Sequence, residues 1–200
     1  MTESTQFAIG TDVACADGPC GEVIRVVVDS ASRVATHLVV EAKHRTGLGR
    51  LVPLDLVSAS DGTTVTLSCS LAEFDALDSA EQIEVPPGMI GRGSDDVPYF
   101  VLGAGNTTPP STVDTLPPGE VAIRPDEPVH ATDGEIGRVE GLVVDGADHR
   151  VTHVLLQEGH LWGRKDVAIP IDAVTRIGDG VWLKLTKGEI ERLPAVEINR

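Results

Sequence analysis

Two histidines, His37 and His153, come closest to a pattern for chemistry in this sequence. Each follows a threonine and precedes apolar residues, in the segments Thr36-His37-Leu38-Val39 and Thr152-His153-Val154-Leu155. A pair of imidazoles could hold a metal ion or relay a proton. A histidine between a threonine and an apolar run is more typical of packing or hydrogen bonding, so we expect no metal and no other cofactor.

The segment His160-Leu161-Trp162-Gly163-Arg164-Lys165-Asp166 holds the densest group of side chains suited to binding. Tryptophan and arginine dominate the binding energy at protein interfaces. We therefore predict that His160, Trp162, Arg164 and Lys165 contact a protein partner. The alternative is that Trp162 covers the open end of its own domain.

No catalytic constellation accompanies these residues. The sequence has no GxSxG, HExxH or P-loop motif, and each of these motifs carries a known mechanism. Glu189 and Glu191 form a carboxylate pair without a pocket signal, and solvation at a helix end explains them. The pieces Gly91-Arg92-Gly93 and Gly103-Ala104-Gly105 do not join a strand to a helix, so they are poor phosphate sites. We predict that the protein is not an enzyme.

Cysteine usage and hydropathy indicate the compartment. Cys15, Cys20 and Cys69 are odd in number and form no CxxC pair. Cys15 and Cys20 could bridge a hairpin, but we expect buried, unpaired thiols. No stretch approaches the roughly 18 apolar residues of a membrane span, and residues 1–9 lack the features of a signal peptide. These observations predict a cytoplasmic protein without a membrane span.

The net charge of −15 limits the classes of partner. A field of this sign repels phosphate groups, which argues against direct binding to nucleic acid or to an anionic membrane. The alternative is that the acidic surface only keeps the protein soluble. A compact basic patch around Arg164 and Lys165 is compatible with either interpretation.

An internal repeat organises the elements that must position these side chains. The segment ADGPCGEVIRVVVD at residues 16–29 corresponds to TDGEIGRVEGLVVD at residues 132–145. We predict that the four shared glycines, Gly18, Gly21, Gly134 and Gly137, provide the backbone geometry of turns, because glycine adopts positive φ without steric cost. The matched pairs are Asp17 with Asp133, Gly18 with Gly134, Gly21 with Gly137, Val23 with Val139, and the two Val-Val-Asp ends.

Both halves carry the same order of predicted elements after this motif. A return strand, a strand containing a proline, a turn, a further strand and a capping box follow in turn. No connection between strands leaves room for a crossover helix, so the strands are expected to pair antiparallel. These elements are residues 34–41, Pro53, Asp61-Gly62, 63–69 and Ser70 to Glu73 in the first half, and 151–157, Pro170, Asp179-Gly180, 181–185 and Thr186 to Glu189 in the second.

The predicted fold is all-β, with two small antiparallel β-barrels at residues 7–81 and 120–197, each ending in a short helix. A linker rich in proline and glycine, residues 82–119, joins them. Glu120 to Ile123 is assigned to the opening of the second barrel. The apolar residues 89–90 and 97–102 are expected to dock the linker on a barrel or in the groove between the barrels. Equivalent barrel faces are expected to meet in an intramolecular pseudo-dimer, and homo-oligomerisation is the alternative.

This series of motifs resembles the PRC-barrel family. The resemblance rests on the Asp-Gly-x-x-Gly-x-Val turn, the Val-Val-Asp hairpin, the Thr-His return strand and Ile169-Pro170-Ile171-Asp172, over residues 8–80 and 120–195. The family includes the barrel of the photosynthetic reaction centre H subunit and that of a small-subunit ribosomal RNA maturation factor. The chain is also similar to bacterial proteins with tandem PRC barrels. The resemblance implies a fold and leaves the function open.

We interpret the chain as a non-enzymatic interaction or scaffold module, because PRC-like barrels of the family dock on other macromolecules. Two alternatives stay open. The first is a ribosome-assembly factor that binds a ribosomal protein. The second is a small-ligand binder or an enzyme that uses the groove between the barrels.

Overall fold

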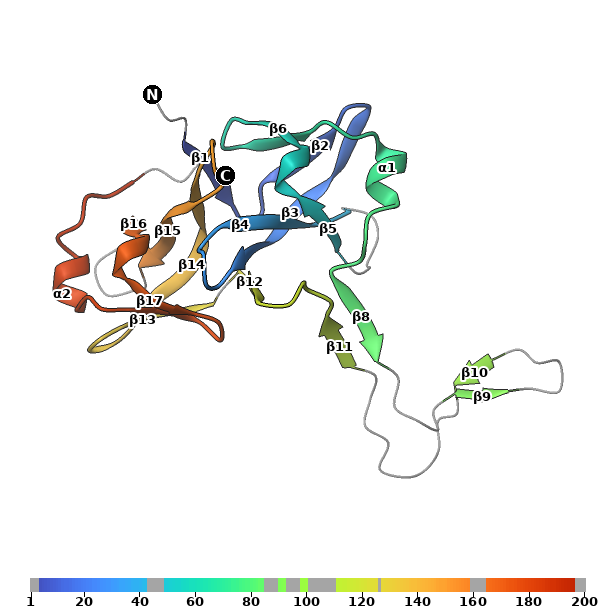
Figure 1. Cartoon of the computed structure of the whole chain (residues 1–200). Coiled ribbons are helices and arrows are strands. Elements are labelled where there is room, and N and C mark those ends of the chain that lie inside the picture. The colour runs from blue at the N-terminus through green and yellow to red at the C-terminus, as the bar shows by residue number, and fades with distance from the viewer. Residues whose placement is uncertain are drawn as a thin grey trace.

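The computed structural model describes residues 4–42, 49–84, 90–92, 98–100, 111–125, 127–158 and 165–196. The protein is mostly β: two curled seven-stranded sheets lie side by side, and each carries one short α-helix (Figure 1). Valine and isoleucine dominate the strands because β-branched side chains pack well on a pleated surface.

The first sheet comes mainly from the first half of the chain and has the strand order β5-β4-β3-β2-β7-β6. Helix η1 (Leu54–Leu56) joins β5 to β6, and α1 (Leu71–Asp75) follows the last strand. The strands are β2 (Asp12–Cys15), β3 (Gly18–Asp29), β4 (Ala35–Glu41), β5 (Arg50–Pro53), β6 (Val57–Ser60) and β7 (Thr64–Leu67).

The second sheet has the matching order β16-β15-β14-β13-β18-β17. Helix η2 (Ile171–Ala173) joins β16 to β17, and α2 (Lys187–Ile190) closes the series. The strands are β13 (Pro128–Ala131), β14 (Gly134–Asp145), β15 (Val151–Glu158), β16 (Lys165–Pro170), β17 (Val174–Ile177) and β18 (Val181–Leu183).

One strand pair in each sheet corrects the prediction of purely antiparallel pairing. β2 pairs with β7, and β13 with β18, in parallel, whereas the other described pairs are antiparallel. This pairing joins the first hairpin of each half to its last strand and thereby curls the sheet. Among the described residues the end strands β5 and β6 do not pair with each other, so the first sheet is a half-barrel. Pro53 and Pro170 lie in end strands, where a missing N–H is tolerated.

Each sheet takes its seventh strand from the opposite half of the chain. β1 (Ser4–Ala8) pairs with β14, and β12 (Glu120–Ile123) pairs with β3. The position of Glu120 to Ile123 after the linker predicts a strand of the second barrel, but in space this strand completes the first sheet. Sequence patterns could not distinguish the two partners, because β3 and β14 end in the same Val-Val-Asp residues.

The exchanged strands contribute to a core that both halves share. Phe7 of β1 is 3% exposed, and Ile123 of β12 is fully buried. Both belong to one hydrophobic cluster with Val26 of the first half and Leu142 of the second. Backbone hydrogen bonds from Ala35 N to His149 O and from Val151 N to Arg33 O, both 2.9 Å long, join the halves at their hairpin ends. The two sheets therefore share both apolar packing and hydrogen bonds.

The capping boxes predicted for both short helices are confirmed. The Ser70 hydroxyl accepts from Glu73 N, and the Thr186 hydroxyl accepts from Glu189 N, both at 3.3 Å. Each glutamate carboxylate accepts in return from the backbone N–H of its partner at 2.8 Å. These backbone hydrogen bonds hold the pKa values of Glu73 and Glu189 below their usual range, because they stabilise the charged carboxylate.

Part of the predicted linker forms strands. β8 (Glu81–Glu84) pairs with β11 (Ser111–Asp114), and β9 (Ile90–Arg92) pairs with β10 (Pro98–Phe100). Figure 1 shows β8 and β11 leading away from the two sheets. The predicted docking of residues 89–90 and 97–102 concerns side chains that lie outside the described part of the chain.

Arg25 of β3 fixes the base of this strand pair. Its guanidinium forms ion pairs with Glu81 and, at 3.0 Å, with Asp114. Arg124 pairs with the second oxygen of Asp114. Burial, with a smaller effect from the nearby charge of Arg124, lowers the pKa of Arg25, and the Asp114 carboxylate opposes that shift by favouring the charged guanidinium. The β8–β11 pair is therefore attached to the first sheet by charge as well as by the chain.

Candidate functional site

A groove of ≈ 820 Å³ lies where the two halves meet. Its walls come from β1, from η1 and β6, and from the turn after β14. Because β1 belongs to the second sheet and β6 to the first, the strand exchange creates this groove. Its volume falls within the range of about 300–1,000 Å³ that is typical of ligand sites.

Small side chains keep the groove open. Ser58 and Ala59 of β6, and Gly146 and Ala147 of the turn, are among its lining residues. The Ser60 hydroxyl donates to Gln6 O at 3.3 Å and so holds β6 beside β1.

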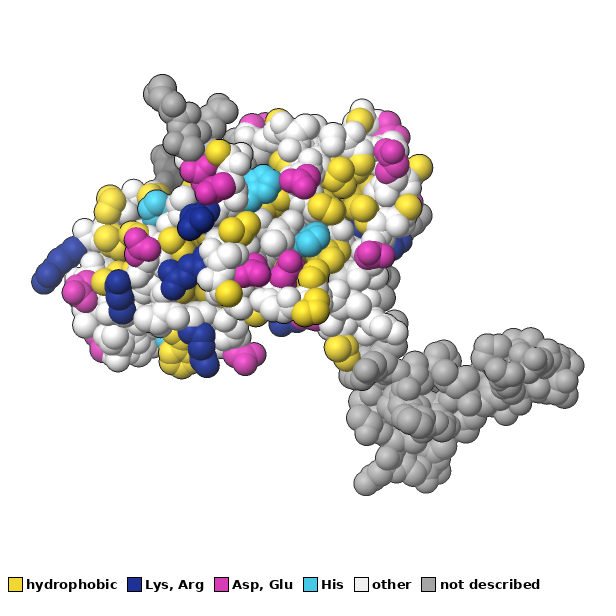
Figure 2. All heavy atoms as spheres, in the orientation of Figure 1, with side chains coloured by type: hydrophobic (Ala, Val, Ile, Leu, Met, Phe, Trp, Pro, Cys, Tyr) yellow, Lys and Arg dark blue, Asp and Glu magenta, His cyan; other side chains and the backbone are white. Residues whose placement is uncertain are grey.

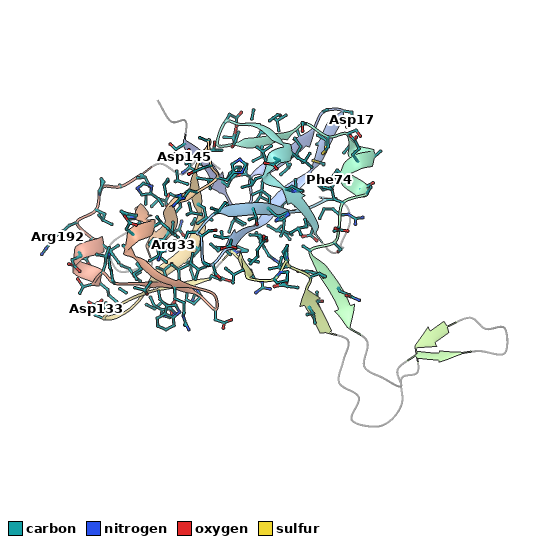
Figure 3. The ribbon with its side chains drawn as sticks, in the orientation of Figure 1. Asp17, Arg33, Phe74, Asp133, Asp145 and Arg192 are labelled. Carbon is teal, nitrogen blue, oxygen red and sulfur yellow. The ribbon has the colours of Figure 1, made fainter. Side chains whose placement is uncertain are left out.

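The turn that forms the opposite wall is rigid and carries a carboxylate. Asp145 Oδ1 accepts from Ala147 N at 2.8 Å, and His149 N donates to Asp145 O at 3.0 Å. His149 adopts φ = 56°, a left-handed conformation that few residues other than glycine adopt. Figure 3 shows Asp145 near the junction of the halves. The described lining residues include this carboxylate and no lysine or arginine, so the groove suits a cation.

Charge is unevenly distributed on the surface of the protein. In Figure 2, Lys and Arg side chains gather mainly over the second half, whereas Asp and Glu are scattered over both halves. With a net charge of −15, the whole protein attracts cationic partners at long range.

The aspartate of the repeated motif has a structural role that sequence reasoning missed. Asp17 Oδ1 accepts from Leu71 N at 2.8 Å, and Asp133 Oδ1 accepts from Lys187 N at 2.9 Å. Each aspartate thus caps the first turn of the helix that ends its own half. The aspartate and the capping box recur together in both halves, which could have indicated that they are related. Neither feature shows, however, which distant N–H donates to the carboxylate.

Replacing Asp133 with alanine should lower the free energy of unfolding by about 0.5–2 kcal/mol, because a free N–H at the start of α2 loses its acceptor. Asp133→Asn is the matched control, since its amide oxygen still accepts the hydrogen bond. Urea denaturation of both variants measures the difference. Equal losses for the two variants would contradict the capping role.

The four glycines predicted to serve turns lie at the first hairpin of each half. Gly18 and Gly134 have φ values of 154° and 127°. A Cβ at Gly21 would lie 2.2 Å from Glu41 O, so only glycine lets β4 approach β3 there. Gly137 is buried in β14, opposite Val129 and Glu158.

His37 and His153 lie on different sheets, in β4 and β15. Nδ1 of each lies 3.0 Å or 3.1 Å from the hydroxyl of the preceding threonine. Glu120 of β12 lies 3.4 Å from His37 Nδ1 and accepts from the Thr36 hydroxyl at 2.9 Å. Within the described ranges, no three His, Cys, Asp or Glu side chains are grouped as metal ligands would be.

The three cysteines are free and buried, as predicted. Cys15 interacts with both Cys20 and Cys69, and the Cys20 thiol donates to Val13 O at 3.4 Å. Burial raises the pKa of Cys15 and of Cys20, because it disfavours the thiolate. The thiols of Cys15 and Cys20 are therefore poor nucleophiles.

The predicted partner-binding residues are only partly placed. His160, Trp162 and Arg164 lie outside the described residues. Lys165 begins β16, and its backbone pairs with Glu158 of β15. The binding role of this loop stays a prediction.

A cluster around Trp182 was not predicted from the sequence. Trp182 of β18 is 37% exposed and stacks on His130 of β13, with ring centroids 4.2 Å apart. The Arg176 guanidinium lies 4.8 Å from the tryptophan ring centroid. The alternation Val181-Trp182-Leu183, buried on both sides of the tryptophan, could have indicated an outward-facing ring.

Comparison with known proteins agrees with this architecture over the second half. A PRC-barrel domain is found at residues 127–190, which spans β13 to α2. A search among curated proteins finds no match for the chain. In the part of the chain that the structure describes, no helix has the length and apolar character needed to cross a membrane. The match at residues 127–190 shows that the chain contains a small β-barrel module of the PRC type.

Proposed function

We propose that this chain is a non-enzymatic cytoplasmic interaction module made of two PRC-like units that exchange a strand, and that the groove between the halves is where a protein partner docks. The observation that carries this proposal is the groove itself, which neither half forms alone. The PRC-barrel domain at residues 127–190 and the matching strand orders support the two-unit arrangement.

The surroundings of the groove suit docking. Two sheets with a shared core hold its walls, and sites on rigid elements bind with little ordering cost. Ser58 and Ala59 are exposed at its rim and accessible to a partner. The exposed Trp182 cluster lies on the second sheet and offers another aromatic anchor.

Photo-crosslinking tests the proposal directly. A benzophenone amino acid at Ala59, on the groove wall, should crosslink one specific protein in cells of the source organism. The same probe at Ala72, which is exposed on α1 away from the groove, is the matched control. Crosslinks that are absent at both positions, or equal at the two, would overturn the assignment of the groove as a docking site.

A second candidate is a small-ligand binder, which the groove's volume favours. A thermal shift of the purified protein with a metabolite panel separates the two candidates. A saturable rise in Tm with one compound, together with no protein crosslink from Ala59, would favour the small ligand.

A further inference from the structure

Arg33 makes a contact between the halves that reveals the chemistry of the groove. Its guanidinium donates from Nη1 to Ile171 O and from Nη2 to Val174 O, both at 2.9 Å. These carbonyls belong to η2 and the start of β17 in the second half. Figure 3 shows Arg33 at the junction of the halves. The guanidinium thus bridges two backbone acceptors of a partly buried site.

The groove is the equivalent place on the other side of the junction. His149 corresponds to Arg33: both have left-handed φ, 56° and 58°, and their neighbours Val34 and Arg150 pair with each other across the junction. Leu54 likewise corresponds to Ile171, because each begins a 3-10 helix that is preceded by a proline. Val57 corresponds to Val174, because each is the residue that follows this helix. His149, Leu54 and Val57 all line the groove.

The first carbonyl of each 3-10 helix accepts the same backbone hydrogen bond. Ile171 O accepts hydrogen bonds from Val174 N and from Arg33, so both lone pairs of this oxygen are used. Leu54 O accepts from Val57 N in the same way. Within the described part of the chain, the His149 ring donates to neither Leu54 O nor Val57 O. By this correspondence, Leu54 O and Val57 O are the counterparts of the two acceptors that bind the Arg33 guanidinium, and Leu54 and Val57 both line the groove.

The remaining lining favours the same ligand. Asp145 adds a carboxylate, and its Oδ1 is held in place by Ala147 N. Ala59 and Ser60 stand where the second half has Arg176 and Ile177, which leaves room for a side chain from outside. A planar guanidinium matches two carbonyls and a carboxylate better than an ammonium does, because its donors form a rigid fork.

We propose that the groove binds the guanidinium of an arginine side chain on a protein partner, with Leu54 O and Val57 O as backbone acceptors and Asp145 as counter-charge. This inference rests on the proposed function, because it names the group by which the partner would be recognised at the same groove. It makes the groove the intermolecular equivalent of the contact that Arg33 makes within the chain.

The test uses the full-length ¹⁵N-labelled protein and three blocked peptides, Gly-Arg-Gly, Gly-Lys-Gly and Gly-citrulline-Gly. We expect the arginine peptide to shift the backbone amides of Ser58, Ala59 and Ala147 saturably. The neutral citrulline peptide has the same shape, and we expect its affinity to be lower by a factor of about ten or more. Equal shifts with arginine and citrulline, or no shifts at all, would overturn the proposal.

Two arginine substitutions in the chain test the site in a second way. His149→Arg should fill the groove as Arg33 fills its own site, abolish binding of the arginine peptide and raise Tm by about 2–4 °C. Ala72→Arg adds the same charge on α1, away from the groove, and should leave peptide binding unchanged. Retained binding in the folded His149→Arg protein would contradict the proposal.

Crosslinking from Ala59 in the His149→Arg background separates this inference from the proposed function. A partner that crosslinks equally with and without the substitution would overturn the arginine site and leave the interaction module standing. Selective binding of the arginine peptide without any crosslinked protein would overturn the interaction module and leave the guanidinium site standing.

Discussion

Replacing Ile123 with alanine is expected to lower the free energy of unfolding by about 2–5 kcal/mol, because the side chain is fully buried and its removal leaves a cavity. The informative result is which of the two sheets loses stability. Ile123 follows the linker in the chain, yet β12 pairs with β3 of the first sheet, and the cluster that contains Ile123 extends into both halves. We therefore expect both sheets to unfold together, at a lower denaturant concentration.

Two probes measure this result. The two tryptophans, Trp162 and Trp182, both lie in the second half of the sequence, so their fluorescence reports on that half, whereas far-UV circular dichroism reports on both sheets. Ile123→Ala should shift both transitions by the same amount. Val113→Ala, at a 43% exposed position of β11, is the matched control and should change stability by less than about 0.5 kcal/mol.

The equivalent substitution in β1 completes the comparison. Phe7→Ala should cost about 3–5 kcal/mol, since Phe7 is buried against the second sheet although it lies at the start of the chain. Separate midpoints for fluorescence and circular dichroism in either variant would contradict a shared core.

Local patterns in the sequence were sufficient for the first hairpins, the end strands and the helix caps of this fold. The capping box at Thr186 depends on residues three positions apart, and the hairpin after Gly134 depends on a turn and alternating apolar residues. The end-strand positions of Pro53 and Pro170 follow from the missing N–H of proline. Each of these signals is confined to a few neighbouring residues, so a single sequence contains it.

The relations between the halves could not be predicted in the same way. β1 and β12 could each pair with β3 or with β14, because both of those strands carry the same terminal residues. The contact of Arg33 with Ile171 O and Val174 O depends on that choice, and so does the groove. The functional site is thus determined by a long-range pairing for which the repeat supplies two equivalent solutions.

Differences between the halves then determine what each side of the junction does. Arg25 in β3 corresponds to Gly141 in β14: Arg25 holds the β8–β11 pair, whereas Gly141 lies beneath β1. β12 ends at Ile123, opposite Val26, whereas β1 continues to Ala8, opposite Gly141. The missing side chain at Gly141 is what lets β1 pair one residue further than β12 does.

Gly141→Ala is therefore expected to displace β1. A Cβ at this position would lie 2.3 Å from Phe7 O and 2.8 Å from Ala8 Cα, distances that require the backbone of β1 to move. Displacing β1 would expose Phe7, so we expect a loss of about 3 kcal/mol or more in the free energy of unfolding. Hydrogen exchange should show lost protection in β1 and β14 before any change in β2 and β7.

Gly188→Ala is the matched glycine substitution. Gly188 lies in α2, and a Cβ added there would meet no atom within 4 Å apart from its chain neighbours and the backbone of its own helix. Alanine is favoured over glycine in a helix by about 0.5–1 kcal/mol. This variant should therefore be more stable than the natural sequence, while Gly141→Ala is less stable. If both substitutions changed stability in the same direction, or if Gly141→Ala kept the protection of β1, the close approach of β1 to β14 would not be what requires glycine there.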